Sequence, residues 1–143
     1  MDQATKNLLC ECSSGCKMAV DSMNQVSRFV SEDKLKKIIA DCKEKHEQLD
    51  KRASDLLKED GETGKQPGMA ASAFSWMTTE IKMKLNQDDS QAAKLMMNGC
   101  NMGIQSISEI MNQNACASKE SRSLAQDIVK AEENFMKELE QFL

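Results

Sequence analysis

Hydrophobic residues recur along the first half of the chain at alternating steps of three and four, which is the spacing of one face of an α-helix. One such stripe contains Leu9, Cys12, Cys16, Ala19, Met23, Val26 and Val30. A second contains Leu35, Ile39, Cys42, His46, Leu49, Ala53 and Leu56. The pattern predicts two long amphipathic helices, over about 5–30 and about 32–60. Ser31 is the expected N-cap of the second, and Gly61 the stop after it.

The second half carries the same pattern. Its first stripe contains Ala93, Met96, Cys100, Gly103, Ile107 and Ile110, and its second contains Ala125, Ile128, Glu132, Phe135, Leu139 and Phe142. These stripes predict helices over about 90–113 and 118–143. The segment 61–68 is rich in Gly and holds the only Pro, so it is the expected linker.

Residues 69–86 read as a further amphipathic helix that contains Trp76. A helix of about 17 residues spans roughly 25 Å, which is the length of a bundle. We therefore expect it to cross from one end of the bundle to the other, with the second and third bundle helices parallel.

The two halves also resemble each other in sequence. The segment GCKMAVDSMNQV at 15–26 aligns with GCNMGIQSISEI at 99–110, with Gly, Cys, Met and Ser identical. This internal repeat predicts that both halves are versions of one helical hairpin.

Composition supports an all-α fold and narrows the function. Aromatic residues make up 3% of the chain, and its 143 residues suit a single domain, 1–143. The net charge of -4 argues against a nucleic-acid partner. Because there is no apolar run of about 18 residues and no basic, apolar leader at the start, we expect a cytoplasmic protein without a membrane partner. The six Cys follow no zinc-ribbon or CxxC pattern, and we expect reduced thiols.

With its repeated hairpins, its Gly-Cys pairs and a crossover that contains SAFSWM, the whole chain resembles the ferritin-like superfamily, especially small bacterial four-helix bundles. In active members, a Glu from each of two helices and a Glu-x-x-His from each of the other two hold two irons. Here the first two positions are Cys16 and Cys100. The other two motifs become Lys43-x-x-His46 and Val129-x-x-Glu132. The resemblance thus implies a degenerate metal site without oxidase or iron-storage activity.

Cys16, His46, Cys100 and Glu132 are the candidate site. Cys16 and His46 are each 15 residues from Ser31, and Cys100 and Glu132 are each 16 from Cys116. Each pair should therefore occupy one layer of its hairpin, and the two layers could meet. Two thiols, an imidazole and a carboxylate suit zinc, and would also accept iron or copper.

Plain packing is the favoured alternative, because buried Cys behaves as a small hydrophobic residue and a buried His46 can pair with Glu132. The leading hypothesis is then a non-catalytic structural or interaction protein that needs no cofactor. Thiol-based metal binding or redox handling is the second hypothesis, and a di-iron oxidase is the third. No catalytic triad or phosphate loop is present in the sequence. The apolar faces of 69–86, with Phe74 and Trp76, predict a homodimer.

Overall fold

A computed structural model describes residues 1–61 and 88–143, and this part of the chain is helical without strands. The bundle helices are α1 (Gln3–Ser27), α2 (Asp33–Glu59), α4 (Asp89–Gln113) and α5 (Lys119–Leu139). A 3-10 turn, η1 (Glu140–Phe142), follows α5. The predicted crossover helix over 69–86, and with it the surface on which the homodimer prediction rests, lies outside the described residues.

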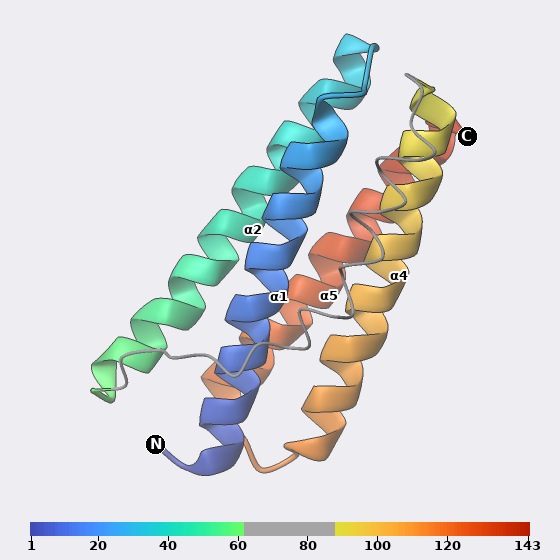
Figure 1. The fold of residues 1–143 in the computed structure, drawn as a ribbon. Coiled ribbons are helices and arrows are strands. Elements are labelled where there is room, and N and C mark those ends of the chain that lie inside the picture. The colour runs from blue at the N-terminus through green and yellow to red at the C-terminus, as the bar shows by residue number, and fades with distance from the viewer. Residues whose placement is uncertain (62–87) are drawn as a thin grey trace.

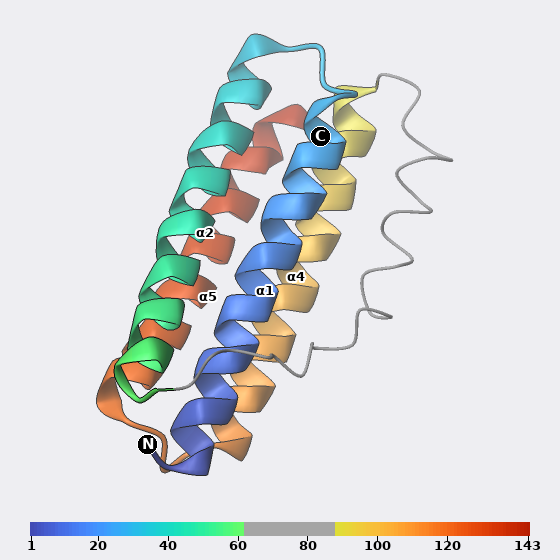
Figure 2. The same ribbon diagram turned by 60° about the vertical axis from the view of Figure 1, so that its left-hand side comes forward.

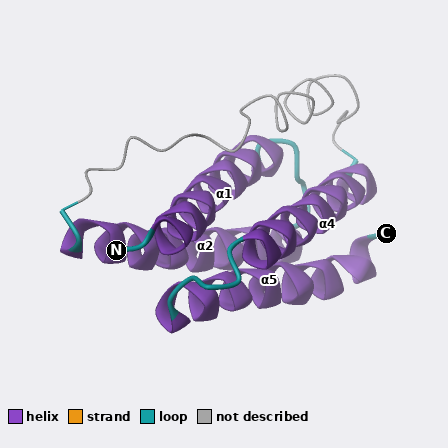
Figure 3. Ribbon diagram, turned by 90° about the horizontal axis from the view of Figure 1, so that it is seen from below, coloured by secondary structure: helices purple, strands orange, loops and turns teal. Residues whose placement is uncertain are grey.

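The four long helices form a bundle of two antiparallel hairpins (Figure 1). α1 lies against α2 and α4 against α5, as the view in Figure 2 also shows for the first pair. Seen from below, α1 and α4 form one layer of the bundle and α2 and α5 the other (Figure 3). The two hairpins pack on each other through α2 with α5 and α1 with α4.

Two contacts between the hairpins fix the directions of the helices. The backbone N–H groups of Ser31 and Glu32, just before α2, both donate to the Asp89 carboxylate at the start of α4, each at 2.9 Å. At the other end of the bundle, the Ser118 N–H before α5 donates to Thr5 Oγ1 in α1, at 2.8 Å. Therefore α2 runs parallel to α4, as the sequence predicts, and α1 runs parallel to α5. The end of α2 and the start of α4 lie at opposite ends of the bundle (Figure 1).

The helix ends differ by a few residues from those predicted. α1 begins earlier, because the Asp2 side chain accepts the Thr5 N–H, and it ends at Ser27 rather than near Val30. The predicted N-cap of α2 was wrong. Glu32 takes that position without a side-chain cap bond, and Asp89 binds the N–H groups there instead. At the C-terminus, α5 stops at Leu139 and the chain tightens into η1.

The stripes form the core, with one shift in register. At the end of α2 the buried residue is Leu57, whereas the predicted Leu56 is half-buried. Two apolar clusters fill the bundle. One is near the α1–α2 turn, with Val30, Leu35 and Leu139, and the other is toward the opposite end, with Leu8, Leu57 and Leu124. No helix in the described part of the chain is long and apolar enough to cross a membrane.

Candidate functional site

A buried hydrogen bond joins the two hairpins at the centre of the bundle. His46 on α2 and Glu132 on α5 meet through Nε2 and Oε1, and the two residues are 1% and 7% exposed. Glu132 lies between Ile128 and Phe135, and these two neighbours belong to different apolar clusters. The pair is therefore a polar layer between the two halves of the core. His46 was predicted for the layer of one hairpin and Glu132 for the layer of the other, and the two residues meet here.

Both ring nitrogens of His46 are occupied. Nδ1 lies 2.8 Å from the backbone oxygen of Cys42, one turn earlier in α2, and 3.5 Å from the Cys42 sulfur. A carbonyl oxygen can only accept, so Nδ1 carries a hydrogen. Nε2 and Glu132 Oε1 then share one further proton. Whichever atom holds it, the pair as a whole is neutral, which lowers the cost of burying it.

The environment favours the protonated imidazole. Burial alone lowers the pKa of His46, because it disfavours the charged ring. The hydrogen bonds to Cys42 and Glu132 and the charge of the Glu132 carboxylate outweigh that effect, and together they raise the pKa of His46 to about 10. We therefore describe the pair as imidazolium and carboxylate.

Thiols from three helices surround this pair. Cys100 on α4 lies beside Glu132, and burial followed by the charge of Glu132 raises the pKa of the Cys100 thiol. Cys16 on α1 is 0% exposed, and burial, Cys12 and Asp50 raise the pKa of its thiol, with a smaller effect of Glu132. Burial also raises the pKa of Cys42. At neutral pH these sulfurs are thiols rather than thiolates.

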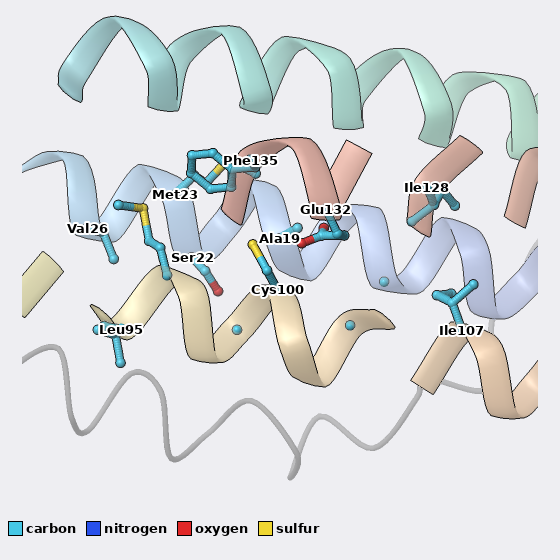
Figure 4. A pocket seen from close by; sticks show the side chains of 14 residues that line it. Ala19, Ser22, Met23, Val26, Leu95, Cys100, Ile107, Ile128, Glu132 and Phe135 are labelled. Carbon is cyan, nitrogen blue, oxygen red and sulfur yellow. The ribbon is translucent and has the colours of Figure 1, made fainter. Parts of the chain in front are cut away.

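A cavity of about 50 Å³ lies beside the pair, between α1 and α4. Small residues make the room: Gly15 and Ala19 on α1 face Gly99 and Gly103 on α4. In Figure 4 the Cys100 sulfur and the Glu132 carboxylate point toward each other at its inner wall. The two copies of the predicted sequence repeat thus line one cavity from opposite sides.

The structure brings three of the four predicted site residues together: His46 hydrogen-bonds to Glu132, and Cys100 lies beside Glu132 in the cavity wall. Cys16 is buried near Glu132, close enough for the carboxylate to influence its pKa. The sequence analysis left Cys42 out of the site. Its position four residues before His46 on the same stripe was the available signal, because residues at that spacing are neighbours on a helix.

The donor set does not fit a di-iron centre. Such a centre needs several carboxylate oxygens, and two of the positions that would supply them are Cys16 and Cys100. The remaining imidazole has no free nitrogen, and the remaining carboxylate already binds His46. Over residues 1–61 and 88–143, no group of three or more His, Cys, Asp or Glu side chains is arranged to hold a metal ion.

Comparison with protein-family models, with curated proteins and with solved structures gives no significant match.

Proposed function

We propose that the chain is a non-catalytic, ferritin-like bundle with a structural or interaction role, in which a neutral His46–Glu132 pair takes the place of a metal centre. The observation that carries the proposal is the occupation of both His46 nitrogens. An imidazole binds a metal through a ring nitrogen that bears no hydrogen. Binding here would break the bond to Glu132 or the bond to the Cys42 carbonyl.

The bundle topology supports the ferritin-like part of the proposal. Parallel α2 and α4 need a long connection between opposite ends of the bundle, which is the one-crossover arrangement of ferritin-like folds. The pairing of the two Gly-Cys segments across one cavity is what two related hairpins would produce.

Metal analysis and thermal melting test the absence of a hard-metal centre. Protein purified from cells grown with added iron and zinc should carry neither in stoichiometric amount. Adding Fe²⁺ or Zn²⁺ should leave the melting temperature unchanged, because only an ion that binds the native state would stabilise it. Stoichiometric iron or zinc that is lost in His46→Gln, but kept in the matched variant Lys45→Gln on the exposed side of α2, would overturn the proposal.

Thiol redox chemistry is the alternative function, and the raised pKa values of the buried thiols oppose it. The thiolate is the reactive form of cysteine. A thiol reagent added to the native protein should react rapidly with Cys116, which is exposed, and slowly with Cys12, Cys16 and Cys100. Cys116→Ser should remove the fast phase. Rapid labelling of Cys16 or Cys100 in the folded protein would favour redox handling instead.

A further inference from the structure

Three sulfur side chains line the cavity between α1 and α4. Met23 comes from α1, and Met96 and Cys100 come from successive turns of α4. All three are buried, with exposures of 4%, 6% and 4%. Glu132 is the only charged residue among the described residues that line the cavity. The cavity therefore presents two thioethers and one thiol in an otherwise largely apolar wall.

We propose that this cavity binds a monovalent soft cation, Cu⁺, through the sulfurs of Met23, Met96 and Cys100. Thiolate and thioether ligands select Cu⁺ over the harder divalent ions. The proposal is independent of the function proposed above, because it uses α1 and α4 and leaves the His46–Glu132 hydrogen bond in place.

Charge balance favours a monovalent ion. Binding breaks the Cys100 S–H bond and forms a sulfur–copper bond, and the proton leaves to solvent, so no group is oxidised or reduced. One thiolate and one Cu⁺ sum to zero, and the His46–Glu132 pair nearby is already neutral. A divalent ion with the same ligands would leave a net positive charge in an apolar cavity, which is costly.

The surroundings of Cys100 are compatible with replacement of its thiol proton by Cu⁺. The ionisable groups that act on its thiol are Glu132 on α5 and Cys42 on α2, and Glu132 is itself paired with His46. The α1 residues along the cavity are uncharged. Glu132 keeps His46 as its partner when the Cys100 hydrogen is lost.

The cavity also has room for the ion. A water molecule needs about 10–15 Å³ of such space, and the cavity offers about 50 Å³. Met side chains have three rotatable bonds and adapt to irregular spaces. This freedom lets Met23 and Met96 turn their sulfurs toward an ion beside Cys100 in the cavity.

Nuclear magnetic resonance of the methionine methyl groups tests the site with Ag⁺, a redox-inert probe of the same charge and softness. The protein should carry ¹³C-labelled methionine methyls and the change Cys116→Ser, which removes the exposed thiol. One equivalent of Ag⁺ should shift two of the eleven methionine signals, and Met23→Leu and Met96→Leu should identify them. Each of these variants should bind Ag⁺ at least about tenfold more weakly.

Met97→Leu is the matched control, because Met97 neighbours Met96 and packs against the same cluster without lining the cavity. It should bind Ag⁺ like the parent. In Cys100→Ser the Ag⁺-induced shifts should vanish, since a hydroxyl is a hard ligand.

Three outcomes would overturn the soft-cation site. They are no methyl shift at one equivalent of Ag⁺, shifts spread over the methionines outside the cavity, and shifts that persist in folded Cys100→Ser. None of them bears on the iron and zinc tests of the function proposed above.

Discussion

His46 Nε2 and Glu132 Oε1 form the hydrogen bond that joins the two hairpins at mid-core, and their side chains are only 1% and 9% exposed. Each residue interrupts an otherwise apolar stripe on its own helix. The pair is tolerated because it is neutral as a unit, and its members are therefore energetically coupled.

Removing one member should cost more than removing both. Glu132→Leu leaves a buried imidazolium without its partner, and we expect a loss of about 3–5 kcal/mol in the free energy of unfolding. His46→Leu with Glu132→Leu should cost clearly less than the sum of the single changes. Urea unfolding of the four proteins at pH 7 measures this coupling. Additive losses would show that the two side chains do not interact in solution.

The pair should make stability fall as the pH rises. The pKa of His46 is raised from 6.5 to about 10 in the folded protein, so above pH 6.5 the folded state holds a proton that the unfolded state has released. The contribution of the pair to the free energy of unfolding is complete below pH 6.5 and is lost as the pH approaches 10. The free energy of unfolding falls by at most about 1.4 kcal/mol per pH unit over this range.

Unfolding measured between pH 6.5 and 8.5 isolates this effect, because buried thiols such as Cys12, whose pKa is raised from 9.0 to about 12, add their own loss only at higher pH. In His46→Gln the decline over this range should be smaller. If stability fell equally with pH in the variant and the parent, the pH dependence could not come from His46.

Asp89 should stabilise the contact between the hairpins at one end of the bundle. Its carboxylate accepts the N–H groups of Ser31 and Glu32, which belong to the other hairpin. Asp89→Ala should cost about 0.5–2 kcal/mol, as for other lost caps. Asp88→Ala is the comparison, since Asp88 caps only its own helix through Ser90. Folding and unfolding rates measured in denaturant should then show slower refolding or faster unfolding for Asp89→Ala, because this change removes a contact between the hairpins. Asp88→Ala should affect only the start of α4.

The register at the end of α2 can be tested with two adjacent leucines. Leu57 is 2% exposed and contributes to the core, whereas Leu56 packs at its edge. Leu57→Ala should cost about 2–5 kcal/mol, and Leu56→Ala should cost less. Leu49→Ala and Phe135→Ala, at positions the sequence placed correctly, should also fall within that range. Equal melting temperatures for the Leu56 and Leu57 variants would indicate that this turn of α2 is frayed.

Two glycines should respond in opposite directions to alanine. At Gly103 an added methyl group would meet the Glu132 side chain at 3.7 Å, an ordinary contact, so Gly103→Ala should stabilise α4 by about 0.5–1 kcal/mol. Gly61 has a φ of 75°, which disfavours a side chain, and Gly61→Ala should destabilise. Thermal melting compares them. Destabilisation by Gly103→Ala would mean that the cavity wall needs the space that glycine leaves.

The sequence alone determined the helices and most of their buried faces, because alternating steps of three and four select one face of a helix wherever it packs. It also predicted one layer in each hairpin, Cys16 with His46 and Cys100 with Glu132, since distance from a turn fixes height along a hairpin. Leu56 was misplaced at the end of α2, where a straight helix drifts from a strict heptad and the stripe passes to Leu57.

Only the tertiary structure decided what these residues do together. The spacing that put Cys16 and Cys100 in the candidate site could not show that Cys100 and Glu132 line one cavity, or that the Cys42 carbonyl occupies the second nitrogen of His46. Asp89 is in the first turn of α4, yet its carboxylate accepts the N–H groups at the start of α2, because the fold brings the two helix N-termini together. Such contacts depend on which helices lie side by side, and periodicity along one helix contains no information about its neighbours.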